Sequence, residues 1–187
     1  MWRKNRQTTP GSNCLGHDIN RNWPYKWNIE DGASTNPCAE DFRGKSAGDA
    51  PETKALSGFL RKVKAAQGLK LYIDWHSYSQ LFMTPYAYSC TARHPRDHEL
   101  QALAKGAARA IYAVHKVQFQ HGPICSTIYQ ASGSSVDYVA DVVRADYMFT
   151  SELRDQGENG FVLPPEQILP SGEEAFAGVK YLLKNMK

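Results

Sequence analysis

Two segments place side chains capable of metal and proton chemistry at the ends of apolar runs. His76 follows the β-prone run Leu69–Trp75, and Glu152 lies near the end of the apolar stretch 146–153. Ligands bind at the carboxyl ends of strands in open α/β sheets, so His76 is a candidate metal ligand, although a lone histidine is more often structural. Burial at a strand end raises the pKa of a carboxylate and suits it to act as a general base. An ion pair between Glu152 and Arg154 is the structural alternative.

A polar loop supplies candidates for recognition of an anionic ligand. Asn20 and Arg21 lie in a segment flanked by an aromatic residue, and the guanidinium fork is shaped for two-point binding of a carboxylate. Tyr129 lies in a segment of small residues that is able to move. Taken alone, Arg21 could instead stabilise its own loop, and Tyr129 could be an ordinary surface tyrosine.

The cysteine spacing excludes some sites and leaves others open. The chain contains 4 cysteines and no Cys-x-x-Cys pair, which disfavours a structural zinc site and a thioredoxin-like redox pair. Two disulfides or four buried thiols both remain open, with a slight preference for disulfides. A thiol peptidase that uses Cys125 with His121 is a further hypothesis, but a disulfide at Cys125 would leave no thiolate to attack a substrate.

The composition argues against several other classes of function. The 187 residues, about the size of one domain, include 22 basic and 19 acidic residues without a run of like charge. We therefore expect no binding to nucleic acid. No stretch of ~18 consecutive apolar residues occurs, so we also expect no insertion into a membrane. Residues 1–7 lack the apolar segment of an export signal.

Helical and strand patterns alternate along the chain after a first stretch of irregular sequence. Residues 1–50 are rich in Asn, Gly, Pro and Ser and predict long ordered loops, where a site is more common than a core. Helices are predicted at 51–67, 95–116, 135–141 and 170–186, strands at 69–75, 81–86, 117–120 and 146–153, and a loop at 122–134. The alternation predicts a layered α/β domain.

Six segments resemble, in order, motifs of the carboxypeptidase A family of zinc metallopeptidases. One such match would be weak, but six collinear matches over essentially the whole chain are specific. The segments are Met1–Lys4, Asn20–Trp23, Asn36–Cys38, His76–Gln80, Ile128–Gly133 and Glu152–Asp155. The resemblance implies a carboxypeptidase-like fold, with a mixed parallel/antiparallel sheet sandwiched by helices. Residues 1–187 would be a single, incomplete catalytic domain whose N-terminal part is missing.

The resemblance also implies catalytic roles. His76 looks like one of three protein ligands of a single catalytic Zn²⁺, which leaves a fourth position for water. Glu152 looks like the base that takes a proton from this water and hands it to the leaving amine. Arg3 looks like the group that stabilises the oxyanion of the tetrahedral intermediate.

Substrate recognition is implied in the same way. Asn20, Arg21 and Tyr129, here named the carboxylate clamp, look like the residues that bind the terminal carboxylate of a peptide. Ser77 and Tyr78 look like neighbours of the residue before the scissile bond. The specificity pocket falls at Met83, Ile124, Ala131, Val136 and Thr150. Val136 at its floor is aliphatic and cannot repay the desolvation of a cation, so we expect a preference for apolar or aromatic C-terminal residues.

The resemblance further pairs Cys14 with Cys38 and Cys90 with Cys125. Two disulfides point to an oxidising compartment, so we expect a secreted, extracellular protein. We expect it to act as a monomer on peptide or protein substrates that have a free C-terminus.

The sequence departs from the family at the other two zinc ligands. The family takes them from a His-x-x-Glu motif in its N-terminal part, and no such motif occurs here. The nearest imitation, His94–Asp97 followed by His98 and Glu99, reads as a solvated helix start. We therefore expect a zinc-dependent exopeptidase whose residues 1–187 require the N-terminal segment of the same domain and are inactive without it. A non-catalytic module that binds peptide C-termini is the alternative.

Overall fold

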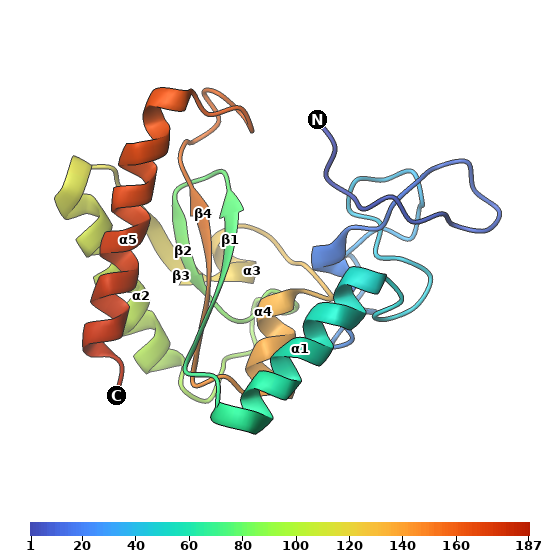
Figure 1. Ribbon diagram of the computed structural model, residues 1–187, viewed down its shortest axis with the longest axis horizontal. Coiled ribbons are helices and arrows are strands. Elements are labelled where there is room, and N and C mark those ends of the chain that lie inside the picture. Colours follow the sequence, from blue (N-terminus) through green and yellow to red (C-terminus); the bar gives the residue numbers. More distant parts are fainter.

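The structure is a computed structural model that describes all 187 residues (Figure 1). Helices and strands occupy most of the chain after residue 50. In chain order they are η1 (Ile19–Arg21), α1 (Pro51–Gln67), β1 (Leu71–Ser77), β2 (Leu81–Thr84), α2 (Asp97–His115), β3 (Gln120–Pro123), α3 (Ile124–Thr127), α4 (Ser135–Tyr138), the π-helical segment η2 (Val139–Val143), β4 (Tyr147–Leu153), η3 (Pro165–Gln167) and α5 (Ile168–Asn185).

The four strands form one mixed sheet in the order β1-β4-β2-β3. β1 pairs with β4 in parallel, β2 pairs with β3 in parallel, and β2 pairs with β4 in the antiparallel direction. Parallel neighbours need a long crossover connection, and α2 lies in the connection between β2 and β3. The predicted mixed sheet is therefore confirmed.

Helices cover both faces of this sheet, as expected for an α/β domain. α2 and α5 pack against each other on one face, and α4 contacts β1 and β4 on the other (Figure 1). α1 lies on the same side as α4 and contacts η2 (Figure 1). No helix combines the length and the apolar character that a membrane span requires.

β4 lies inside the sheet and contributes much of the core. Tyr147, Met148 and Phe149 are buried, and the ring of Phe149 packs on Phe82 of β2 with 5.4 Å between ring centroids. Full burial of a large apolar side chain contributes roughly 1.5–3 kcal/mol. Strands buried on both faces are continuous apolar runs, which explains why this strand could be predicted from the sequence.

Residues 1–50 form ordered loops, as predicted, and side-chain hydrogen bonds hold them. The fully buried Asn22 amide donates to the carbonyl oxygens of Arg43 and Ser46 and to the carboxylate of Asp49. Its oxygen accepts from the backbone N–H of Ala50, directly before α1. A buried polar group without a partner costs about 1–3 kcal/mol, so Asn22 stabilises this part of the chain.

α1 has the predicted bounds, but two of its apolar side chains face outward. Pro51 occupies the first turn, and the N–H of Gly68 caps the last turn on the carbonyl oxygen of Lys64. Leu56 and Phe59 are exposed, whereas smaller polar residues of this helix are buried. The periodicity therefore predicts the helix correctly, but not which of its apolar side chains are buried.

Several other element bounds differ from the sequence prediction. β1 begins at Leu71 and continues to Ser77, so His76 lies inside the strand and not behind it. The strand predicted at 117–120 lies at 120–123, because pairing with β2 overrides the weak strand preference of Gly and Pro. The predicted loop at 122–134 contains α3, and the predicted helix at 135–141 is divided into α4 and η2.

Candidate functional site

A cavity of about 330 Å³ lies at the carboxyl ends of β1 and β4. It brings together every predicted catalytic, metal-binding and substrate-binding residue, although these residues are distant in the sequence. They are Arg3, Asn20, Arg21, His76, Ser77, Tyr78, Met83, Ile124, Tyr129, Ala131, Val136, Thr150 and Glu152. The role of each residue remains a prediction, but their common location is a property of the fold.

His76 and Glu152 are direct neighbours in the parallel pairing of β1 with β4. Oε2 of Glu152 is buried and has no hydrogen-bond partner in the protein. Burial raises the pKa of Glu152 to about 7, although the charges of His76 and Arg3 act in the opposite direction. A carboxylate with this pKa can accept a proton from water near neutral pH. The alternative ion pair is absent, because Arg154 binds Glu174 instead.

His76 is held through one ring nitrogen. Its Nε2 lies 2.9 Å from Oδ2 of Asp74 and 3.1 Å from Nδ2 of Asn20, and no protein group hydrogen-bonds to Nδ1. Burial lowers the pKa of His76, but the hydrogen bond and the charge of Asp74 raise it, and the net pKa lies above the ordinary value. The ring therefore presents Nδ1 as its one nitrogen without a protein partner.

Arg3 reaches the cavity from the N-terminal loop. Its Nε and Nη2 donate to Oδ2 and Oδ1 of Asp18 at 2.9 and 3.2 Å, which is a two-point ion pair. This geometry fixes the plane of the guanidinium group. Nη1 has no protein partner and remains available to a ligand in the cavity.

Arg21 is a buried cation without an anionic partner. The residue is 8% exposed, and its side chain makes one hydrogen bond, from Nη1 to the Asn20 carbonyl oxygen at 2.9 Å. None of the ion pairs of the protein includes it. Buried charges are normally paired, so this part of the cavity is complementary to an anion with two oxygen atoms.

Asn20 differs from Arg21 because both ends of its amide are already bonded. Its Nδ2 donates to Oδ2 of Asp74 at 3.1 Å, and its Oδ1 accepts from the backbone N–H of Ser135 at 2.8 Å. Asn20 thus connects η1 to β1 and to the first turn of α4. Within the carboxylate clamp, Arg21 keeps several free donors, whereas Asn20 keeps one N–H after its bond to Asp74.

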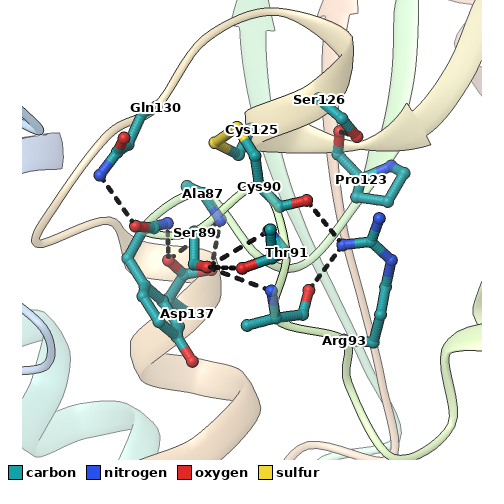
Figure 2. The surroundings of a disulfide bond; sticks show 12 residues. Ala87, Ser89, Cys90, Thr91, Arg93, Pro123, Cys125, Ser126, Gln130 and Asp137 are labelled. Atoms are coloured by element: carbon teal, nitrogen blue, oxygen red, sulfur yellow. Dashed lines mark hydrogen bonds between the residues drawn. A yellow bond between two sulfur atoms is a disulfide. The ribbon is translucent and has the colours of Figure 1, made fainter.

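Tyr129 stands at the mouth of the cavity and is 52% exposed. Its ring lies 5.7 Å from the guanidinium carbon of Arg21. The loop on either side of it is attached to the segment after β2. Before Tyr129, the disulfide from Cys125 to Cys90 makes this connection (Figure 2). After it, Nε2 of Gln130 donates to the carbonyl oxygen of Tyr88 at 3.2 Å (Figure 2).

The inner end of the cavity is apolar. Its side chains come from β2, β4, the loop around α3 and the first turn of α4, and they are buried: Met83, Ile124, Ala131, Val136 and Thr150. The turn of α4 is fixed to the segment after β2, because the carboxylate of Asp137 accepts the backbone N–H groups of Ala87 and Tyr88 (Figure 2). None of these five side chains is charged, and Glu152 is the one acidic side chain elsewhere in the cavity. The inner end therefore suits an uncharged group.

Some cavity residues are absent from the sequence prediction. Ser79, Ala87, Ile128, Ser134 and Phe161 also line the cavity. Phe161 lies at the mouth, with its ring centroid 4.8 Å from that of Tyr78, and its irregular segment has no periodicity that would identify it. Asp74 was also missed; it does not line this cavity but binds His76. Its spacing of two residues from His76 places both on one face of a strand, so the sequence contained a signal for this contact.

Both disulfides implied by the resemblance are present, Cys14 with Cys38 and Cys90 with Cys125, and no cysteine is free. Cys125 therefore provides no thiolate. The hypothesis of a thiol peptidase that uses Cys125 with His121 is wrong.

His76 is the residue of the cavity that fits a metal ion best. No three His, Cys, Asp or Glu side chains are grouped so that they could hold a metal ion. His76 fits as one ligand, because metal-binding histidines commonly donate their other ring N–H to a carboxylate. A catalytic zinc site takes three protein ligands, of which His76 would be one. In the segment His94–Glu99, Glu99 binds Arg96 and Tyr147 instead.

Comparison with known proteins identifies the family of this chain. A family model described as zinc carboxypeptidase matches residues 1–178. A metallocarboxypeptidase A-like protein of Trichophyton verrucosum is 56% identical over 187 residues, which are 100% of this chain and 44% of that protein. Carboxypeptidase A2 of Mus musculus is 42% identical over all 187 residues, which are 43% of its length. The chain thus spans less than half the length of these curated relatives.

Solved structures agree with the sequence comparisons. Bovine thrombin-activatable fibrinolysis inhibitor, in complex with tick carboxypeptidase inhibitor, matches with a TM-score of 0.93 at 37% identity, over 100% of this chain and 62% of that chain. Carboxypeptidase A from Helicoverpa armigera matches with a TM-score of 0.86 at 28% identity, over 98% of this chain and 45% of that chain. With the family model matching residues 1–178, this chain belongs to the zinc carboxypeptidase family.

Proposed function

We propose that residues 1–187 are a single, incomplete catalytic domain of a zinc-dependent exopeptidase that removes apolar or aromatic residues from peptide C-termini. The observation that carries this proposal is Arg21, a buried guanidinium group without an anionic partner beside an apolar cavity. A chain end supplies the carboxylate that Arg21 lacks, whereas an internal peptide bond supplies no charge. The apolar inner end of the cavity supports an uncharged side chain.

The proposed reaction assigns one task to each group around the scissile bond. Arg21 binds the terminal carboxylate, and Tyr129 covers it from the mouth of the cavity. Glu152 takes a proton from the attacking water and passes it to the leaving amine. Nη1 of Arg3 donates to the oxyanion, and donors aimed at a developing charge are among the strongest contributions to catalysis.

The preceding part of the peptide would leave through the mouth of the cavity. A second cavity of about 830 Å³ adjoins the first and shares Arg21, Tyr129 and Phe161 with it. Ser77 and Tyr78 would contact the residue before the scissile bond. The larger space outside the mouth supports a substrate that is a peptide or protein with a free C-terminus.

The proposal includes one Zn²⁺ per complete domain. His76 would hold it together with two ligands from polypeptide outside residues 1–187, which we expect to be the N-terminal segment of the same domain. When bound, the ion would supply a water of lowered pKa. Residues 1–187 alone would neither bind zinc tightly nor cleave peptides, because one ligand leaves the ion to solvent.

The two disulfides support secretion into an extracellular, oxidising compartment. A monomeric state, and the lack of nucleic-acid or membrane partners, remain predictions from the sequence.

The decisive experiment compares two peptides that end in Phe, one with a free carboxylate and one with a C-terminal amide. The zinc-loaded complete domain, which includes the N-terminal segment, should cleave only the first. Arg21→Lys keeps the charge but loses the two-point geometry, so kcat/KM should fall about 100-fold with the free peptide. Equal cleavage of both peptides would exclude the clamp. Stoichiometric binding of the first peptide without zinc or cleavage would instead identify a non-catalytic binding module.

The pocket assignment has its own test. Val136→Asp places a carboxylate on the pocket floor and should move the preference from Phe, Leu or Tyr towards Lys or Arg. Val136→Asn is the matched control, because it has the same shape as Asp without the charge. Unchanged preference in Val136→Asp, measured with matched peptides, would place the specificity pocket elsewhere.

A further inference from the structure

One carboxylate oxygen lies behind both His76 and the carboxylate clamp. Oδ2 of Asp74 is 2.9 Å from Nε2 of His76 and 3.1 Å from Nδ2 of Asn20, and Oγ of Ser135 donates to the same oxygen. The four side chains come from β1, η1 and α4. Asp74 therefore joins three elements at a single acceptor, on the side of His76 opposite its unpartnered Nδ1.

These contacts determine which nitrogen of the neutral His76 ring carries the proton. An ionised carboxylate only accepts hydrogen bonds, so Nε2 must donate to Asp74. Nδ2 of Asn20 also lies 3.1 Å from Nε2, but two N–H groups cannot bond to each other. The hydrogen of Asn20 therefore points at Asp74. Nδ1 is left as the nitrogen with a lone pair, and it has no protein partner.

The same oxygen holds the side chain of Asn20, whose backbone in turn contacts Arg21. The side-chain amide of Asn20 is fixed between Asp74 and the backbone N–H of Ser135, and the backbone carbonyl oxygen of Asn20 accepts from Nη1 of Arg21. Without the carboxylate, the Asn20 amide and the Ser135 hydroxyl lose their shared acceptor. The support of the buried guanidinium would then loosen.

We propose that Asp74 is a positioning residue that holds the ring of His76 with Nδ1 towards the cavity and sets the carboxylate clamp at the same time. The proposal rests on the proposed function for the tasks of His76 and Arg21. Asp74 itself does not line the cavity, so it acts through these neighbours and does not touch the substrate.

The first test reads the ring directly and requires neither zinc nor substrate. Two-bond ¹H–¹⁵N correlation spectra of the ¹⁵N-histidine-labelled protein, recorded with increasing pH until the His76 signals stop moving, distinguish the two tautomers of the neutral ring. The wild-type protein should show His76 with the proton on Nε2. A proton on Nδ1 would overturn the proposal.

The second test removes the acceptor. In the complete domain with its N-terminal segment, Asp74→Ala should give a mixture of His76 tautomers, lower the affinity for Zn²⁺ about 10–100-fold, and weaken the binding of N-acetyl-L-phenylalanine, a probe that carries a terminal carboxylate. Asp146→Asn is the control, since Asp146 binds Lys64 and Lys70 just before β4, at the other end of the strand. The control should leave all three readouts unchanged.

The outcomes separate this inference from the proposed function. A wild-type protein that includes the N-terminal segment, binds no zinc and cleaves no peptide, but has the Nε2-protonated ring, would refute the proposed function and keep the action of Asp74 on His76. A single tautomer and unchanged probe affinity in Asp74→Ala would refute the positioning role, whatever the activity. If Asp74→Ala does not fold, Ser135→Ala removes one bond to Asp74 and should weaken probe binding by a smaller factor.

Discussion

The two walls of the cavity are held by different interactions. The strand wall consists of His76, Thr150 and Glu152, and the loop wall consists of Arg3, Arg21 and Tyr129. Main-chain pairing of β1 with β4 fixes the strand wall, because shifting one of its side chains would require a shift of the whole strand register. The loop wall has no such ladder and depends on side-chain hydrogen bonds and two disulfides.

The difference separates proton transfer from the binding of negative charge. Glu152, which is proposed to move the proton, lies on the rigid wall, and the arginines proposed to bind the oxyanion and the terminal carboxylate lie on the loops. Single substitutions should therefore affect the two walls in different ways. On the strand wall they should remove a chemical group and leave its neighbours in place, whereas on the loop wall they should also displace the neighbours.

The largest effect is expected on the strand wall. In the zinc-loaded protein, Glu152→Gln should lower turnover about 10³-fold, because the amide cannot accept a proton, while zinc content stays the same. Tyr147→Phe is the control on the same strand, since Tyr147 does not line the cavity and its hydroxyl bonds to Glu99 away from the site. The control should stay within a few-fold of wild type. Near-normal turnover in Glu152→Gln would place the general base elsewhere.

The next prediction compares a loop residue with a strand residue. Asn22→Ala leaves several buried polar groups without partners and should lower the free energy of unfolding by about 4 kcal/mol. Ser151→Ala removes one hydrogen bond, from Oγ to the Leu81 carbonyl oxygen, and should cost about 1 kcal/mol. Urea denaturation measures both values. Equal losses of stability would show that side-chain hydrogen bonds matter no more for the loops than for the strands.

Removing a disulfide tests the loop wall at a larger scale. The double substitution Cys14→Ser with Cys38→Ser opens a loop with a sequence separation of 24 and should cost roughly 3 kcal/mol in the chain-entropy model. The binding of N-acetyl-L-phenylalanine should weaken as well, because the same loops hold Arg3 and Arg21. Reduced stability with unchanged affinity would mean that the disulfide supports the fold but not the wall.

The smallest effect is expected at the mouth. Phe161→Ala removes the aromatic contact with Tyr78 and should weaken the binding of a tripeptide substrate by about 1 kcal/mol. KM should therefore rise roughly five-fold, with kcat unchanged. A dipeptide that does not reach the mouth should show no change. Phe161→Leu keeps the apolar volume and should give an intermediate result. A fall in kcat would give Phe161 a task in the reaction itself.

The sequence predicted the elements that have strong local signals. α1 was predicted with its bounds, and β4 was predicted within one residue, because amphipathic periodicity and a continuous apolar run both act locally. β3 was displaced by three residues because its position depends on pairing with β2, and no local pattern encodes that pairing. The outward orientation of Leu56 and Phe59 also depends on tertiary contacts.

For the site, the resemblance located residues but not their interactions. All the candidates line one cavity, yet the sequence did not show that the amide of Asn20 is bonded at both its nitrogen and its oxygen or that Arg3 binds Asp18 at two points. These interactions join residues from different loops and strands. They follow from the folded arrangement, which a linear motif does not contain.

The parallel pairing of β1 with β4 also determines when a site can exist. β2, α2 and β3 all lie between these strands in the chain, so Leu71 meets Tyr147 only after most of the domain has been synthesised. Such distant contacts form late, because the entropy of closing the intervening loop must be overcome first. His76 and Glu152 stay apart until then. A growing or partly folded chain therefore lacks the paired histidine and carboxylate that the proposed reaction would use.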